Sequence, residues 1–190
     1  MTYRLTRGFT LIETFIVIAM SVVALAALAN LFIMFNTSYG YQQAFIASAG
    51  SASSAMNALE ASVLPADQVL ASHSFNGTTY SSGAATLVLE LPSIDSSGNV
   101  ITGVYDYIVF YASATNLYRL TVIGTGSVRS AGLKLLSATL SSLSFTYDNA
   151  DFTKVTSVTA DLETQAQFKQ QTVESHLAER LYLRNLQPLP

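Results

Sequence analysis

A long uncharged stretch near the N-terminus constrains this chain more than any other feature. Residues 14–59 contain no Asp, Glu, Lys or Arg, and within them residues 15–35 carry only two polar side chains, Ser21 and Asn30. A helix crosses the hydrocarbon core of a bilayer with about 20 predominantly apolar residues. Residues 15–35 therefore predict one membrane-spanning helix.

Positive charges predict the orientation of this helix. Arg4 and Arg7 precede it, and the next Lys or Arg along the chain is Arg119. Lys and Arg concentrate on the cytoplasmic side of a membrane helix. We therefore expect a single pass through the inner (cytoplasmic) membrane, with the N-terminus in the cytoplasm and the rest of the chain outside.

The helix is expected to continue beyond the membrane as far as Leu64. Residues 36–64 contain no proline, and Pro65 is a natural stop. Apolar residues recur in this segment at steps of three and four, which is the spacing of one buried helical face. They are Tyr41, Phe45, Ala49, Ala52, Met56, Leu59 and Val63.

After Pro65 the pattern changes from helical to β. Residues 72–83, rich in Ser, Gly, Asn and Thr, are interpreted as an exposed loop. Runs typical of strands follow, with turn residues between them, at 86–91, 104–112, 117–123, 143–147 and 155–162. We expect an antiparallel meander in which residues 105–111 are buried on both sides. Residues 165–183 fit a helix or a strand, with a closing strand at the very end.

The predicted fold class is therefore α+β, with a long N-terminal membrane-spanning α-helix packed on a C-terminal antiparallel β-sheet domain. The 190 residues are enough for one soluble domain and an anchor. A net charge of −3 without any basic cluster argues against nucleic acid as a partner. The absence of cysteine excludes disulfides, thiol catalysis and cysteine-based zinc sites.

The sequence shows no set of residues arranged for catalysis or metal binding. His73 and His176 lie in polar segments with no carboxylate or nucleophile at a fixed spacing, so both are interpreted as surface histidines. Residues 124–127, Gly-Thr-Gly-Ser, lack the Lys and helix that follow a phosphate-binding loop, and are interpreted as a turn. Residues 148–151 resemble one arm of a calcium loop but offer too few oxygens. We expect no enzymatic activity, no metal and no cofactor.

Residues 7–13, taken together with the apolar run, resemble a known family. Their sequence, Arg-Gly-Phe-Thr-Leu-Ile-Glu, is similar to the cleavage and methylation motif of type IV prepilins and pseudopilins. The resemblance implies that prepilin peptidase cuts between Gly8 and Phe9 and that Phe9 is N-methylated. Glu13 then becomes the fifth residue of the mature chain, and the resemblance implies that it pairs with the amine of a neighbouring subunit during assembly.

This motif implies a division of the chain into four parts. Residues 1–8 are the leader, residues 9–35 the transmembrane half of the helix, residues 36–64 its extramembrane half, and residues 65–190 a β-rich globular domain with a pilin-like fold. Residues 143–148 and 181–185 carry a second resemblance, to the J-type minor pseudopilins of type II secretion and the W-type minor pilins of type IV pili.

The two resemblances together imply a structural subunit that primes or caps a type IV pilus or a type II secretion pseudopilus. Its partners would be prepilin peptidase, inner-membrane lipid and other pilin or pseudopilin subunits. One alternative is a DNA-uptake or adhesive minor pilin whose soluble domain binds a ligand. Another is a secreted domain released by signal peptidase after Ala29, because Ala27-Leu28-Ala29 forms an A-x-A site.

Overall fold

The computed structural model describes residues 10–184 of the chain. The described residues divide into two units, residues 10–43 and 44–184. The described residues form an α+β fold with one helix, one 3-10 turn and ten strands. These are α1 (Leu11–Val63), β1 (Gln68–Val69), β2 (Ser72–Phe75), β3 (Thr78–Ser81), β4 (Thr86–Ile94), β5 (Val100–Ser113), β6 (Asn116–Val122), β7 (Gly132–Ser137), β8 (Leu140–Tyr147), η1 (Phe152–Lys154), β9 (Ser157–Phe168) and β10 (Gln171–Tyr182).

Helix α1 is 53 residues long and closely follows the expected boundaries. Its described part begins at Leu11, and the expected first residue, Phe9, lies outside the described residues. It ends at Val63, one residue before the expected end at Leu64. Pro65 has no N–H to continue the ladder of hydrogen bonds, so the helix stops there.

The buried face of α1 within residues 44–63 differs in part from the expected one. Its members are Ala44, Ser48, Ala52, Ala55, Met56, Leu59, Ser62 and Val63. The C-terminal half of the expected face is confirmed, but Tyr41 and Phe45 are 47% and 50% exposed and Ala49 is only partly buried. Small side chains, Ala44 and Ser48, occupy the N-terminal end of this face because the helix comes close to β9 there. Ser48 Oγ donates to the carbonyl oxygen of Thr164 at 2.9 Å.

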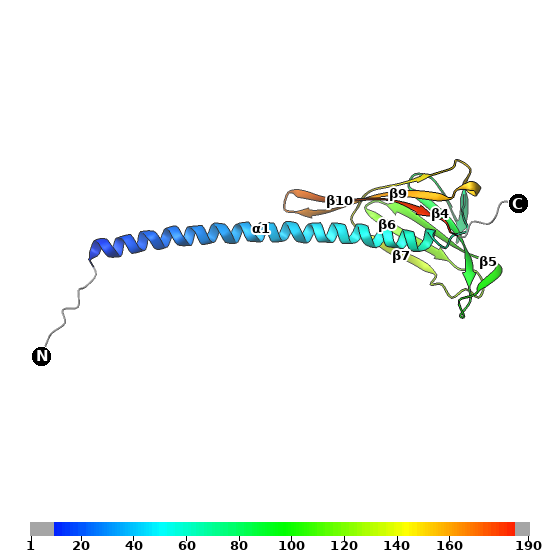
Figure 1. The fold of residues 1–190 in the computed structure, drawn as a ribbon, viewed down its shortest axis with the longest axis horizontal. Coiled ribbons are helices and arrows are strands. Elements are labelled where there is room, and N and C mark those ends of the chain that lie inside the picture. The colour runs from blue at the N-terminus through cyan, green and yellow to red at the C-terminus, as the bar shows by residue number, and fades with distance from the viewer. Residues whose placement is uncertain (1–9, 185–190) are drawn as a thin grey trace. The chain divides into compact units, whose positions relative to one another are not determined.

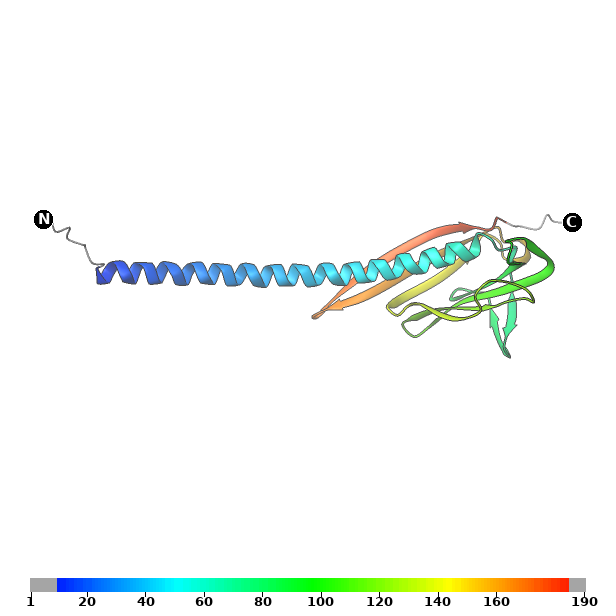
Figure 2. The same ribbon diagram turned by 90° about the horizontal axis from the view of Figure 1, so that it is seen from below.

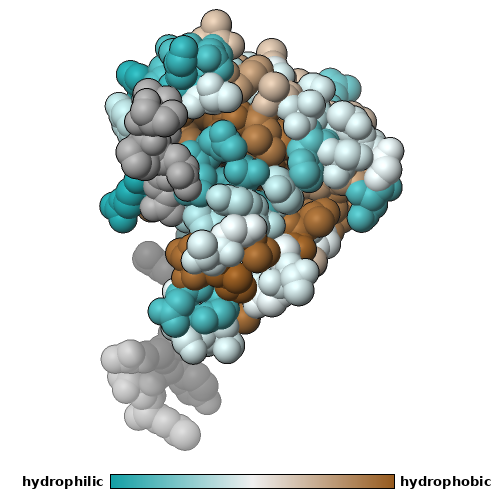
Figure 3. Space-filling model, turned by 90° about the vertical axis from the view of Figure 1, so that its right-hand side faces the viewer, coloured by the Kyte–Doolittle hydropathy of each residue, from teal (hydrophilic) through white to brown (hydrophobic). Residues whose placement is uncertain are grey.

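The strands form three antiparallel sheets. The largest has five strands in the order β1-β4-β5-β6-β7, the second has three in the order β10-β9-β8, and β2 and β3 form a separate hairpin. The C-terminal part of α1, drawn in cyan, runs beside β9 and β10 in both views (Figure 1, Figure 2). On one face of the domain, hydrophobic residues form patches between hydrophilic ones (Figure 3).

Two hydrophobic clusters cover the two faces of the five-stranded sheet. The main cluster joins residues 52–63 of α1 to both large sheets. A smaller cluster, formed by Phe75, Val88 and Val109, lies under the β2–β3 hairpin. Strand β5 contributes Ile108 and Phe110 to the first cluster and the intervening Val109 to the second. The expectation that this strand is buried on both sides is therefore confirmed.

The structure corrects several strand predictions. Residues 72–83 form the β2–β3 hairpin rather than a loop, with Asn76 and Gly77 at positive φ angles of 50° and 88°, as a tight type I′ turn requires. Strand β7 lies in a segment for which the sequence predicts none, and β9 begins at Ser157 instead of residue 155. Strand β10 pairs with β9 along its whole length, so the helical alternative for residues 165–183 is wrong.

Candidate functional site

A reciprocal pair of hydrogen bonds holds the N-terminal end of α1. The Glu13 N–H donates to Thr10 Oγ1 at 3.3 Å, and the Thr10 N–H donates to Glu13 Oε2 at 3.5 Å. This arrangement is a capping box, in which two otherwise unpaired helix-end donors are satisfied. An acidic residue in the first turn also lies near the positive end of the helix dipole. The Thr-x-x-Glu spacing carries the signal for this cap, which the sequence prediction did not include.

The Glu13 carboxylate is otherwise unpaired within residues 10–184. It is exposed, it forms no ion pair there, and Thr10 is its only hydrogen-bond partner in that range. Gly8 and Phe9, where cleavage and methylation are expected, lie outside the described residues. Among residues 10–184, the Glu13 carboxylate therefore has no ion-pair partner at the start of an apolar helix.

The surface of α1 that follows Glu13 is apolar and exposed. All of residues 11–39 are exposed, and α1 is long and apolar enough to span a membrane. The Ser21 hydroxyl is satisfied inside the helix, because it donates to the Val17 carbonyl oxygen at 2.8 Å. Such a bond removes the cost of placing a hydroxyl in lipid. The Asn30 side chain, in contrast, makes no hydrogen bond with any residue that the structure describes.

Buried and partly buried hydroxyl groups join α1 to β9 of the three-stranded sheet and to the end of β7 in the five-stranded sheet, all within the second unit. Ser48 and Thr164 are both fully buried and bond reciprocally: Ser48 Oγ donates to the Thr164 carbonyl oxygen at 2.9 Å, and Thr164 Oγ1 donates to the Ser48 carbonyl oxygen at 2.8 Å. Three residues further along the helix, Ser51 Oγ lies 2.8 Å from Ser137 Oγ and 3.1 Å from Thr139 Oγ1. Because buried polar groups need partners, these bonds fix the position of the helix along the sheet.

A fully buried carboxylate, Asp106, organises one end of the five-stranded sheet. Its Oδ1 accepts hydrogen bonds from Ser93 Oγ at 2.7 Å and from the Gly124 N–H at 2.8 Å. Its Oδ2 accepts from Ser127 Oγ at 2.7 Å and from Arg129 Nη1 at 2.6 Å. Residues 124–127 therefore form a turn, as expected, and two of its residues bind this carboxylate.

The ionised form of Asp106 is favoured. Burial raises the pKa of this carboxyl, but the hydrogen bonds from Ser93, Gly124, Ser127 and Arg129 together outweigh burial and hold the pKa below its usual range. A buried, ionised carboxylate with four donors stabilises the surrounding loops. The sequence prediction missed this role because the donors lie 13 to 23 residues away along the chain.

The two histidines lie in different surroundings. His73 stacks on Tyr107 with ring centroids 3.8 Å apart. His176 Nε2 lies 2.9 Å from Asp161 Oδ1 on the neighbouring strand, a carboxylate 15 residues away in the sequence, and the exposed side chain confirms His176 as a surface histidine. The side chains of this pair are 59% and 45% exposed, and a pair so exposed contributes about 1 kcal/mol at most.

The acidic residues at 148–151 bind local backbone groups. Asp148 accepts hydrogen bonds from the N–H groups of Thr156 and Ser157, and Asp151 accepts from the Thr153 N–H at the start of η1. These bonds are typical of a turn. In the part of the chain from 10 to 184, no group of three or more His, Cys, Asp or Glu side chains could hold a metal ion.

No protein-family model, no curated protein and no solved structure matches this chain. The features that bear on its function are therefore those of its own residues. They are the unpaired Glu13 carboxylate, the exposed apolar surface of α1 and the β-sheet domain that packs against residues 44–63.

Proposed function

We propose that this chain is a minor pilin or pseudopilin, a structural subunit anchored by α1 that primes or caps a type IV pilus or a type II secretion pseudopilus. The observation that carries the proposal is an acidic side chain, Glu13, in the first turn of an exposed apolar helix, with no ion-pair partner among residues 10–184. The motif at residues 7–13 supports it, with the cut after Gly8 and methylation of Phe9.

The position of the charge supplies a mechanism for assembly. A carboxylate near the end of a membrane helix is costly in lipid and is usually paired or functional. The proposed cut creates a positively charged amine on Phe9, four residues before Glu13. When one subunit is shifted along the membrane normal relative to its neighbour, the amine of one meets the carboxylate of the other. A misplaced subunit would leave a charge unpaired in lipid, so the correct stagger is favoured.

The remaining partners follow from the same anchor. Residues 15–35 would contact inner-membrane lipid before assembly and the helices of other pilin subunits afterwards. Arg4 and Arg7 would hold the leader in the cytoplasm, where prepilin peptidase reaches it. The domain formed by residues 65–184 would then lie outside the membrane.

The test is the N-terminal mass of the mature protein purified from its own cells. We expect a chain that begins at N-methylated Phe9, and we expect Gly8→Val to leave the full-length precursor uncut. Gly83→Val, remote from the motif, is the matched control and should be processed normally. A mature chain that begins at Asn30 would refute the proposal and would indicate a secreted domain.

A further inference from the structure

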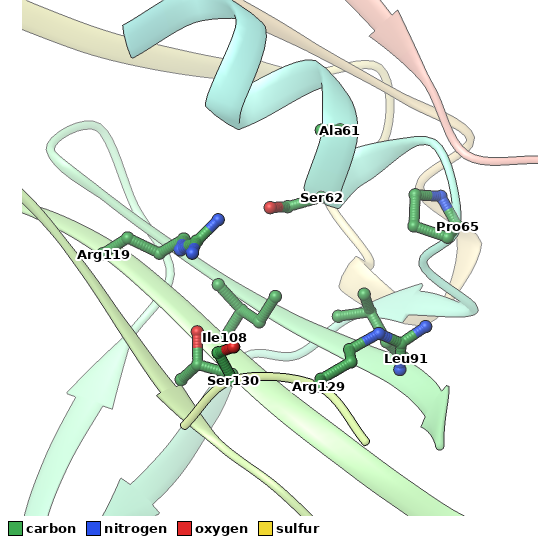
Figure 4. Close-up of a pocket in the computed structure, with 9 residues that line it drawn as sticks. Ala61, Ser62, Pro65, Leu91, Ile108, Arg119, Arg129 and Ser130 are labelled. Carbon is green, nitrogen blue, oxygen red and sulfur yellow. The ribbon is translucent and has the colours of Figure 1, made fainter. Parts of the chain in front are cut away.

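A small cavity lies between the last turn of α1 and the five-stranded sheet. Its volume is about 240 Å³, and its lining includes Ser62 of α1, Pro65 after the helix, Ile108 of β5 and Arg119 of β6. Ser62 and Arg119 point toward one another across this space (Figure 4). The cavity is smaller than the 300–1,000 Å³ typical of small-molecule sites. It has room for one side chain rather than for a cofactor.

Arg119 is the unusual member of the lining. Its Nε is buried and has no hydrogen-bond partner, and Arg119 forms no ion pair with any residue from 10 to 184. A buried donor on a charged group is costly when it stays unsatisfied. The Arg119 guanidinium therefore has a donor that could bind an acceptor from another molecule.

The charges around the cavity favour an anionic acceptor. Arg129 also lines it, but Asp106 already neutralises this second guanidinium. Lys134 stands directly opposite Arg119 on β7, so both side chains are on the same face of the sheet. None of the lining residues is acidic. Glu60, in the last turn but one of α1, lines a different cavity together with Arg180.

A structural role for Arg119 is the alternative explanation. The last turn of α1 contains no basic residue. A cation supplied by the sheet would therefore interact favourably with the negative end of the helix dipole. The two explanations differ in a measurable way. If Arg119 serves the helix end, its removal destabilises the free protein; if it awaits an anion, its removal leaves stability unchanged or raises it.

We propose that the Arg119 cavity receives the carboxylate of an Asp or Glu side chain from a neighbouring protein subunit. Guanidinium and carboxylate groups pair through two parallel hydrogen bonds, the geometry that best suits a planar fork in a narrow space. Val128, which precedes the lining residue Arg129 in the sequence, is 53% exposed. Arginine is enriched among the residues that dominate binding at the centre of a protein interface. The inference rests on the proposed function, which places other subunits beside this domain.

The first test is thermal unfolding of the full-length protein in detergent micelles with sodium acetate as the carboxylate probe. We expect acetate to raise the Tm of the unmodified protein, after correction with sodium chloride at equal ionic strength. Arg119→Gln should abolish this rise and leave the Tm without acetate unchanged or higher. Lys134→Gln, on the exposed neighbour, is the control and should keep most of the rise. A lower Tm for Arg119→Gln together with no effect of acetate would establish the structural role and overturn the proposal.

The second test identifies the source of the carboxylate in cells. The chain has no cysteine, so Ser130→Cys places a single thiol at the cavity for a photo-crosslinker. We expect capture of a neighbouring subunit near one of its Asp or Glu residues. Arg119→Glu should reduce capture about tenfold or more, since it replaces an attractive charge pair at the interface by a repulsive one. Changing that partner residue to Arg should restore capture.

The outcomes separate this inference from the proposed function. Arg119→Glu could leave capture unchanged while acetate still raises the Tm in micelles. That result would indicate that the ligand is a free small carboxylate, and it would overturn the proposal that a neighbouring subunit supplies it. The N-terminus of the Arg119→Glu protein is measured in the same sample. If it begins at Phe9 while capture is lost, the proposed function holds and the cavity is the contact. If it does not begin at Phe9, the proposed function fails whatever the cavity binds.

Discussion

Replacing Asp106 by Ala is expected to destabilise the β-sheet domain strongly. The substitution removes a carboxylate that is 0% exposed and accepts four hydrogen bonds. Ser93 and Ser127 lose their acceptor, and Arg129 loses its ion-pair partner, while Ala offers no replacement. The four groups that lose this acceptor lie on two segments of the chain, β4 and the loop between β6 and β7, so the damage extends beyond β5.

The size of the effect follows from the burial of the two charges. Removing one partner of a buried ion pair costs about 3–5 kcal/mol. The Arg129 side chain is 20% exposed, so water can partly solvate its guanidinium once Asp106 is gone. The lower end of that range, about 3 kcal/mol, is therefore expected. For a protein of this size it corresponds to a fall in Tm of about 6–12 °C.

Thermal unfolding of the full-length protein in detergent micelles measures this effect. The chain has no Trp and ten Tyr residues, so near-ultraviolet circular dichroism reports on the tyrosines. Glu174→Ala is the control, because this glutamate is exposed on β10 and its loss should change stability by no more than about 0.5 kcal/mol. If Asp106→Ala changes the free energy of unfolding by less than 1 kcal/mol, the reasoning is wrong.

The same carboxylate sets a pH dependence. Because the pKa of Asp106 is lowered in the folded state from its ordinary value of 3.8, the unfolded state takes up a proton first as pH falls. The stability from this group is therefore fully present above about pH 5 and is lost progressively as the pH falls through 3.8 and below. Asp106→Ala should have a flatter acid limb in a plot of Tm against pH than the unmodified protein.

Three further predictions concern single residues. Glu13→Gln keeps a side chain that can complete the capping box but removes the charge. This variant should still be cut before Phe9 but should fail to enter filaments. Glu13→Ala should behave in the same way. Normal incorporation of both variants, measured in sheared filament fractions, would contradict the charge-pairing mechanism. Gly124→Ala should lower the free energy of unfolding, measured by chemical denaturation, by about 1–3 kcal/mol, because a Cβ there would lie 2.7 Å from the Tyr105 carbonyl oxygen. Gly83→Ala is the control, because a Cβ at that position meets nothing within 4 Å. Asn30→Leu should still insert into the membrane but enter filaments about threefold less well, since an interhelical hydrogen bond in lipid averages about 0.6 kcal/mol. Ser21→Ala, whose hydroxyl is already bonded to Val17, should show no such loss.

The helix was predictable because its signal is dense and local. A run of 21 residues with two polar members specifies a membrane-spanning length without any tertiary information. The buried face was predictable only where large apolar residues form it. At Tyr41 and Phe45 the prediction was wrong because it counted every apolar residue at a three- or four-residue step as buried. The close contact between Ser48 and Thr164 requires small side chains instead.

Strand errors have two separate causes. Residues 72–83 look like a loop by composition, yet Asn76-Gly77 is the strongest short hairpin signal, and it was overlooked. At the C-terminal end, Val173, Leu177 and Leu181 are spaced by four residues. That spacing puts them on one face of a strand as well as near one face of a helix. Only the pairing of β10 with β9 decides between the two.

The Asp106 centre was partly visible in the sequence. Asp106, Ile108 and Phe110 alternate along one strand, so an acid that shares a face with two buried apolar residues needs a partner. The sequence does not reveal which donors meet that need, because Ser93 comes from β4 and Ser127 and Arg129 come from the loop between β6 and β7. The same limit applies to Arg119, whose unsatisfied Nε depends on where the last turn of α1 ends.

The cap at Glu13 is compatible with its proposed role in assembly. The capping box uses the backbone N–H of Thr10 and leaves the N-terminal amine out of the bond. A cut between Gly8 and Phe9 would therefore remove no atom of the cap. Among residues 10–184, only Oε2 of the carboxylate accepts a hydrogen bond, which leaves Oε1 for the amine of a neighbouring subunit in the proposed assembly. One side chain can thus hold the helix start in the precursor and keep its charge oriented for pairing after the cut.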